Sequence, residues 1–259
     1  MSRSRQSAIG LTLAGGFALA WLALHFTGIF AVDLGTESWA VVTVIVLLQA
    51  WLSTALFITA HDAMHGALAP TLPRLQRFAG RAALMIYAGI DYDRMTPKHF
   101  AHHKAVGTGG DPDFNAENPR TFGPWLARFF MTYYTHSQLA RITAVAAIYL
   151  LTGASLLNIV VFWAVPALLA MVQLFTFGTW LPHRHAEDAF ADRHRARSNA
   201  LPDWASLLTC FHFGGCHHEH HLHPSEPWWR LPERRREMRA ASQAAAKAEA
   251  TSASLRPNS

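Results

Sequence analysis

The sequence predicts an all-α integral membrane protein, with four transmembrane helices in two hairpins and a cytoplasmic, histidine-rich cap for two metal ions. Three observations lead to this prediction. Hydrophobic residues make up 51% of the 259 residues, and charged residues only 15%. Much of this apolar content is concentrated in long stretches, as membrane-spanning helices require. Most of the 16 histidines stand in three short clusters beside those stretches.

The spans follow the apolar stretches in chain order. Residues 9–32 and 39–60 are each long enough to cross the hydrocarbon core, which takes about 20 residues, and they form the first hairpin. Residues 141–153 and 156–180 form the second, with a turn at Thr152–Ser155; one very long helix is the alternative. Residues 78–90 contain Arg81 and are too short to cross, which predicts an interfacial or re-entrant helix. Residues 1–259 are predicted as a single domain whose Ala- and Ser-rich tail, 240–259, is disordered.

The distribution of basic residues sets the predicted orientation. All 22 Lys and Arg residues fall within 1–5, 74–141 and 184–256, and none lies in the connections 33–38 and 153–158. Basic residues collect on the cytoplasmic side of membrane proteins, so both termini and all three histidine clusters are predicted to be cytoplasmic. A nucleic-acid binder would concentrate its basic residues on one groove-facing surface. We therefore predict a lipid bilayer, and no nucleic acid, as partner.

The histidine clusters have the spacing of metal ligands on helices. His61 and His65 are four positions apart, and at about 100° per residue such a pair lies on one helix face. The other clusters, at 99–103 and 217–221, share the frame H-x2-H-H. Adjacent histidines diverge by about 100°, which suits a pair that serves two different ions. The predicted ligands in these frames are His61, His65, His99, His102, His103, His217, His220 and His221.

A ninth ligand and several outer partners are predicted nearby. His183 directly follows the last apolar stretch and is the preferred ninth ligand, with His185 as the alternative; His218 is the alternative to His217. Neutral imidazole suits iron, copper, zinc and nickel, and iron is preferred for oxygen activation because it changes oxidation state. Carboxylates often accept the second N–H of a ligating histidine, which nominates Asp62, Asp111, Asp113 and Glu219.

The three clusters resemble the histidine boxes of the membrane fatty-acid desaturase and hydroxylase superfamily. Longer runs are similar to the bacterial β-carotene 4-ketolases: HDAMHG at 61–66, HHKAVGTGGDPDF at 102–114, LPHRH at 181–185 and FHFGGCHHEHHLHPSEPWWRLP at 211–232. The resemblance covers about residues 40–232. It departs locally at Gly214-Gly215-Cys216, where an aromatic residue is expected before the box.

This resemblance implies a non-haem di-iron oxygenase of the bacterial inner membrane. The implied reaction hydroxylates ring carbon C4 of a β-ionone ring twice and yields a ketone. It would convert β-carotene to echinenone and then canthaxanthin, and zeaxanthin toward astaxanthin. The implied cofactors are two iron ions, with O₂ as co-substrate and electrons from ferredoxin or a reductase. No catalytic residue separate from the metal ligands is predicted, and the oligomeric state is left open.

An apolar tunnel would hold the carotenoid, mostly by burial of its apolar surface. Large side chains near the spans are its predicted lining, although helix packing explains each of them equally well. They are Phe57, Met64, Leu84, Met85, Tyr87, Phe175 and Phe177.

Two other classes of function fit parts of the sequence. Another oxygenase of the superfamily (a carotenoid 3-hydroxylase, an acyl-lipid desaturase or an alkane hydroxylase) needs the same metal chemistry, and only the flanking runs favour the ketolase. A membrane metal transporter would carry ionisable residues within its spans. Here the histidine clusters gather at one membrane face instead, which favours the oxygenase.

Overall fold

The computed structural model describes residues 1–185 and 189–254, and these contain helices and no strand. The elements in chain order are α1 (Arg3–Phe30), α2 (Trp39–Met64), α3 (Pro73–Ala88), α4 (Tyr92–Ala105), α5 (Phe122–Tyr133), α6 (His136–Leu151), α7 (Leu156–Ile159), η1 (Val160–Ala164), α8 (Val165–Phe175), η2 (Thr176–Trp180), α9 (Leu181–His183), α10 (Asp203–Cys210), α11 (His217–Leu222), η3 (Trp228–Arg230) and α12 (Leu231–Ser254). The predicted all-α class is confirmed.

Three helices in the described part of the chain are long and apolar enough to cross a membrane: α1, α2 and the continuous run Leu156–His183. They correspond to the predicted spans 9–32, 39–60 and 156–180. Each has 26 to 28 residues, and at about 1.5 Å per residue each extends about 40 Å, more than the hydrocarbon core of about 30 Å. Ser2 and Ser38 begin α1 and α2 by accepting backbone N–H groups with their side chains.

The segment predicted as a further span forms α6, which is shorter. It has 16 residues and extends about 24 Å, and it is not one of the three helices named above. Thr152 ends α6, Gly153 has a φ of 99°, a conformation that glycine adopts without strain, and Ser155 caps α7. The predicted turn at 152–155 is therefore present, and the alternative of one very long helix is wrong.

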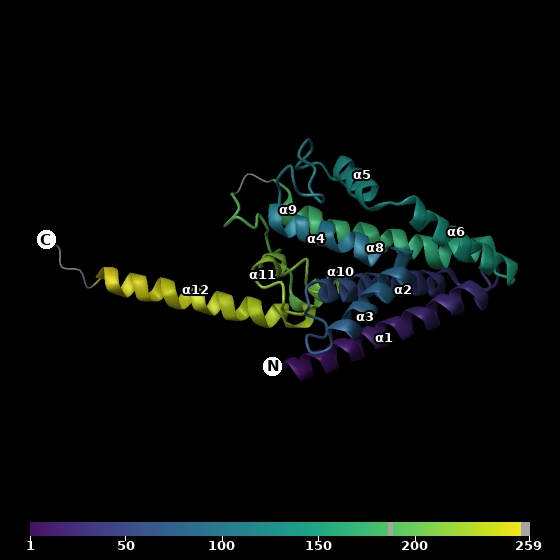
Figure 1. Cartoon of the computed structure of the whole chain (residues 1–259), viewed down its shortest axis with the longest axis horizontal. Helices are drawn as coiled ribbons and strands as arrows, with labels where there is room; N and C mark the ends of the chain where they lie inside the picture. Colours follow the sequence, from purple (N-terminus) through teal and green to yellow (C-terminus); the bar gives the residue numbers. More distant parts are fainter. Residues whose placement is uncertain (186–188, 255–259) are drawn as a thin grey trace.

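α2 lies at the centre of the bundle, packed against α1, α3 and α8 (Figure 1). The Trp21 indole N–H donates to Ser53 Oγ at 2.9 Å and joins α1 to α2. At the start of α7, the Asn158 side-chain amide donates to the Gly28 carbonyl at 2.9 Å. Gly28 permits this close approach, because a Cβ there would lie 2.6 Å from Cγ of Phe162. This hydrogen bond joins the start of the third span to the end of α1. The turn after α1 and the turn after α6 therefore lie at the same end of the bundle.

The short helix predicted at 78–90 overlaps α3, which begins at Pro73 and ends at Ala88. α3 packs along α2 and is capped by Gly89, whose φ is 62°. Arg81 on α3 forms an ion pair of 2.6 Å with Asp93 on α4, and both side chains are exposed. α3 carries Arg74, Arg77 and Arg81, and charged side chains are costly in the hydrocarbon core, so α3 is not expected to cross it.

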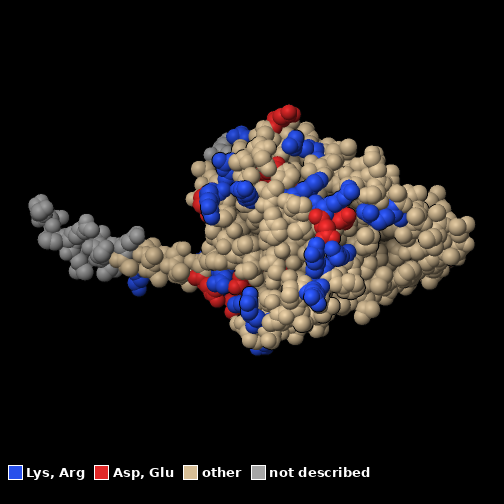
Figure 2. All heavy atoms as spheres, in the orientation of Figure 1, with Lys and Arg blue, Asp and Glu red and all other residues tan. Residues whose placement is uncertain are grey.

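α4, α9 and α11 gather at the opposite end of the bundle, near the N-terminus (Figure 1). α12 begins there and projects away from the body. The sequence predicted disorder from residue 240; instead α12 continues to Ser254, because Ala, Glu, Lys and Gln are strong helix formers. Residues 255–259 lie outside the described part. On the face shown in Figure 2, Lys and Arg lie over the part of the molecule near α12 and across its middle, and the far end of the bundle carries none.

Candidate metal centre

Nine histidine side chains from four helical segments meet at this end of the bundle. The end of α2 carries two, α4 carries three, α9 carries one and α11 carries three. Within α4 and α11, spacings of three and four residues keep ligands for one place on the same side of the helix. All nine were predicted from the sequence: His61, His65, His99, His102, His103, His183, His217, His220 and His221.

The nine rings form two groups, and within each group one nitrogen per ring lies within 4.8 Å of the others. The five-histidine group contains His61, His65, His99, His103 and His220, and the four-histidine group contains His102, His183, His217 and His221. The adjacent pairs 102–103 and 220–221 are each divided between the groups, as the angular divergence on a helix predicts.

The donor atoms of both groups fit a first-row transition metal. His65 Nε2 lies 2.6 Å from His99 Nε2, and His183 Nε2 lies 2.8 Å from His217 Nε2. His183 Nδ1 donates to the carbonyl of Arg195 at 2.8 Å, which leaves a lone pair on its Nε2. Metal–imidazole bonds are about 2.0–2.1 Å long, so ligands on opposite sides of one ion are about 4.2 Å apart. Converging lone pairs repel unless a cation lies between them, and an all-nitrogen set suits iron, copper, zinc or nickel.

Burial keeps these imidazoles neutral and therefore able to bind a metal. It lowers the pKa of His99, His220 and His221 well below the ordinary value of 6.5, and neighbouring histidines add to the effect. Burial likewise lowers the pKa of His103 to about 2. These four histidines therefore offer lone pairs, and not imidazolium charges, at neutral pH.

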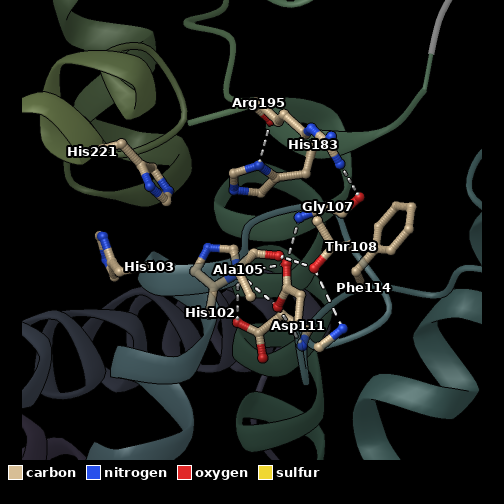
Figure 3. A network of polar contacts seen from close by, with 12 residues as sticks. His102, His103, Ala105, Gly107, Thr108, Asp111, Phe114, His183, Arg195 and His221 are labelled. Atoms are coloured by element: carbon tan, nitrogen blue, oxygen red, sulfur yellow. Dashed lines mark hydrogen bonds and ion pairs between the residues drawn. The ribbon is translucent and has the colours of Figure 1, made fainter. Parts of the chain in front are cut away.

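Asp111 holds His102 in position (Figure 3), and Asp113 lies nearby. His102 Nδ1 donates to Asp111 Oδ1 at 2.9 Å, and Asp111 also accepts the backbone N–H groups of Gly107 at 2.8 Å and Asp113 at 2.9 Å. Asp113 lies 3.8 Å from the same Nδ1 and accepts the hydroxyl of Tyr133. Burial opposes the protonation of His102, but these carboxylates outweigh it and raise its pKa. Nδ1 thus carries the proton, and Nε2 is left for the four-histidine group.

Comparison with known proteins identifies the family. The fatty acid desaturase family model matches residues 37–146 and 136–251. The β-carotene ketolase of Paracoccus sp. (strain N81106 / MBIC 01143) is 47% identical over 88% of this chain and 93% of that protein. The β-carotene ketolase of Paracoccus sp. (strain PC1) is 44% identical, also over 88% of this chain and 93% of that protein. The zeaxanthin 4-ketolase of Chlamydomonas reinhardtii is 36% identical over 88% of this chain and 55% of that protein.

The chain belongs to the fatty acid desaturase family. The resemblance that the histidine boxes and their flanking runs predicted is confirmed.

For two ligands of this desaturase-family chain the sequence left a choice, between His183 and His185 and between His217 and His218. Their positions in the structure differ. His183 and His217 belong to the four-histidine group, whereas His185 and His218 belong to neither group. The His185 ring packs against the ring of Phe114, with the two ring centroids 5.0 Å apart. His218 points toward the surface, where Nε2 lies 2.8 Å from a carboxylate oxygen of Asp192.

The remaining predicted carboxylates differ in their relation to the groups. Asp62 is buried, and its Oδ1 lies 3.7 Å from Nδ1 of His61. Glu219 instead accepts the hydroxyl of Ser198 and lies 3.5 Å from Arg235. Among the described residues no contact joins its carboxylate to a histidine of either group, because Glu219 lies on the opposite side of α11 from His217 and His221.

The departure from the family pattern before the third box has a packing reason. A Cβ on Gly215 would lie 2.2 Å from Oγ of Ser206, and a Cβ on Gly214 would lie 3.1 Å from Cβ of Phe177. The backbone that leads into α11 is therefore in direct contact with α10 and η2. A larger residue at either position would push the third box away from the other two.

A small cavity of about 70 Å³ adjoins both groups. Histidines of both groups form part of its wall, and most of the rest is apolar. The apolar side chains include Phe57, Ile58, Met64, Met95, Phe129, Leu174 and Phe213.

Two of the side chains predicted to line a substrate tunnel, Phe57 and Met64, line this cavity. The other five lie outside its wall: Leu84, Met85, Tyr87, Phe175 and Phe177. The sequence did not reveal Tyr133 or Thr179, which also line the cavity. The π turn η2 is one reason, since it shifts the helical period after residue 175 and changes which side chains share a face.

Proposed function

We propose that this chain is a β-carotene 4-ketolase. The observation that supports it most directly is the pair of histidine groups at the wall of a largely apolar cavity, in a chain 47% identical to a protein named β-carotene ketolase. The substrate is a carotenoid with β-ionone rings, and the products from β-carotene are echinenone and then canthaxanthin. Zeaxanthin would be converted toward astaxanthin, in agreement with a relative named zeaxanthin 4-ketolase.

Each histidine group would hold one iron ion, so the nine histidines are the proposed ligands. Bound iron would supply the redox chemistry that activates O₂, with electrons from ferredoxin or a reductase. Each hydroxylation consumes one O₂, two electrons and two protons, places one oxygen atom in a C–H bond at C4, and releases the other as water. The second hydroxylation gives a gem-diol, which loses water to form the ketone.

The chain's own residues bind, orient and shield the ring. The apolar side chains of the cavity exclude water and hold the ring by burial, which contributes about 25 cal/mol per Å². The histidines in the wall fix the distance between the metal centres and the ring, so the pose of the ring selects C4. Asp111 holds the proton on His102 Nδ1 and thereby orients that ligand.

The proposed topology has four crossings, with both termini and the histidine groups on the cytoplasmic side of the bacterial inner membrane. Three spans satisfy length and composition, and α6 would supply the fourth crossing from residues 141–153. An even number of crossings agrees with the absence of Lys and Arg from 33–38 and 153–158. A substrate dissolved in the bilayer would then reach the cavity sideways.

Expression in cells that accumulate β-carotene, followed by chromatography and mass analysis of the pigments, tests the function. Echinenone and canthaxanthin are expected. Cryptoxanthin or zeaxanthin would instead indicate a 3-hydroxylase, and unchanged β-carotene with folded, iron-loaded protein would refute a carotenoid substrate.

Variants of one histidine per group test the ligand assignment. His65→Ala and His221→Ala should each remove about one of two irons and abolish ketone formation while the protein stays in the membrane. His218→Ala, outside both groups, is the matched control and should keep both irons. Full iron content in either ligand variant would contradict the assignment.

A further inference from the structure

One hydroxyl in the wall of the cavity has no partner within the described part of the protein. Thr179 lies in η2 near the end of the third span, lines the cavity and is only 7% exposed. Its side chain forms no hydrogen bond with any residue in 1–185 or 189–254. The hydroxyl is not among the fully enclosed polar atoms that lack a partner in the described residues, so it is accessible to a ligand in the cavity that Thr179 lines.

Several other threonines in the helices use their hydroxyls locally. Their hydroxyls donate to the backbone carbonyl four residues earlier, the usual arrangement for threonine within a helix. This holds for Thr43, Thr54, Thr96, Thr132, Thr176 and Thr209. Thr176 is the informative comparison, because it lies in the same π turn as Thr179 and still makes the bond, to Val172 at 2.6 Å.

The π turn explains how Thr179 comes to face the cavity. The Leu181 N–H donates to the Thr176 carbonyl five residues earlier, which widens the helix at this point. Single π turns are frequent at functional sites. Leu174, Gly178 and Thr179 line the same cavity, and glycine at 178 leaves room beside the hydroxyl.

Most other polar groups of the cavity wall belong to the two histidine groups or to their outer partners. One nitrogen of each histidine converges within its group. The Tyr133 hydroxyl donates to Asp113, which is itself beside His102. The Thr179 hydroxyl belongs to neither set, and it is able both to donate and to accept. Its natural partner is an uncharged hydroxyl on an otherwise apolar ligand.

We propose that Thr179 hydrogen-bonds a hydroxyl group on the ring of the bound carotenoid and so favours hydroxylated rings over unsubstituted ones. This inference rests on the proposed carotenoid substrate. A ring hydroxyl can come from two sources: the 3-hydroxyl of zeaxanthin, or the 4-hydroxyl that the first oxidation installs. Either one would be held within the cavity that adjoins both histidine groups, where C4 must lie.

Three full-length variants test this role. Thr179→Val removes the hydroxyl at nearly constant volume, Thr179→Ser retains it, and Thr176→Val is the control on the same turn. Purified enzymes of equal iron content and thermal stability would receive equimolar β-carotene and zeaxanthin. Two quantities would be measured: the ratio of kcat/KM for the two pigments, and the ratio of bound pigments without an electron donor.

Loss of one hydrogen bond to a neutral group predicts a change of about three- to tenfold. Thr179→Val should lower both zeaxanthin-to-β-carotene ratios by that factor if the 3-hydroxyl is bound. If the 4-hydroxyl is bound, the variant should instead release 4-hydroxylated pigment from β-carotene. Thr179→Ser and Thr176→Val should resemble the wild type in each case. Unchanged ratios and an unchanged product distribution in Thr179→Val would overturn the inference.

The binding measurement separates this inference from the proposed function. Wild-type enzyme that forms no ketone from either pigment would refute the ketolase. The ratio of bound pigments would still decide whether Thr179 recognises a ring hydroxyl.

Discussion

Replacement of Asp111 by asparagine tests how the second nitrogen of a ligand controls the metal centre. The buried Asp111 carboxylate accepts hydrogen bonds from three donors: His102 Nδ1, at 2.9 Å from Oδ1 and 3.0 Å from Oδ2, and the N–H groups of Gly107 and Asp113 at 2.8 and 2.9 Å. Asparagine has nearly the same shape, but one of its oxygens becomes an NH₂ group. Whichever way the amide turns, NH₂ faces at least one N–H donor.

The expected effect follows from these hydrogen bonds. One or two buried donors lose their acceptor, and each loss costs about 1–3 kcal/mol. His102 Nδ1 contacts both carboxylate oxygens, so with an NH₂ group in place of one of them it is no longer fixed as the protonated nitrogen, and the ring is free to turn away from the four-histidine group. Loss of such an outer partner typically weakens metal affinity about 10- to 100-fold. We therefore expect Asp111→Asn to lose mainly one of the two irons.

Iron per protein, measured by mass spectrometry after dialysis against a graded series of chelator concentrations, provides the assay. Asp192→Asn is the matched control: Asp192 pairs with His218 at 2.8 Å, but that histidine belongs to neither group. The control should hold iron as the wild type does. If Asp111→Asn retained both irons at the same chelator concentration as the wild type, the orienting role of Asp111 would be refuted.

Two further predictions concern packing and the cavity. Gly215→Ala places a Cβ 2.2 Å from Oγ of Ser206, so it should destabilise the protein by about 1–3 kcal/mol and lower its Tm. Gly109 has open space around it, so the control variant Gly109→Ala should keep the Tm of the wild type. Equal Tm values for the two variants would contradict the close packing before α11. Met64→Trp should fill the cavity that Met64 lines and reduce ketone formation at least tenfold with iron content unchanged. Met85→Trp, on a side chain that is 48% exposed, should leave activity intact, and equal activity of the two variants would argue against substrate in this cavity.

The histidine groups could be predicted from the sequence because their spacing is a local property. Residues three and four apart share a helix face wherever the helix goes, and adjacent residues diverge. For this reason the spacing alone indicates that the adjacent pairs at 102–103 and 220–221 are each divided between two metal groups. The apolar lengths of the three long spans are local in the same sense, since they depend only on composition and the rise per residue.

The sequence alone thus determined the class of fold, the histidine clusters and the family. Tertiary structure decided the rest, because it depends on which surfaces meet. His218 and Glu219 lie beside His217 in the chain, but they face away from the metal groups and pair with Asp192 and Arg235. Tyr87 is as large and apolar as Phe57, but only Phe57 faces the cavity. A side chain's position along a helix fixes its direction around that helix, while the groups that it meets there are set by helices far away in the sequence.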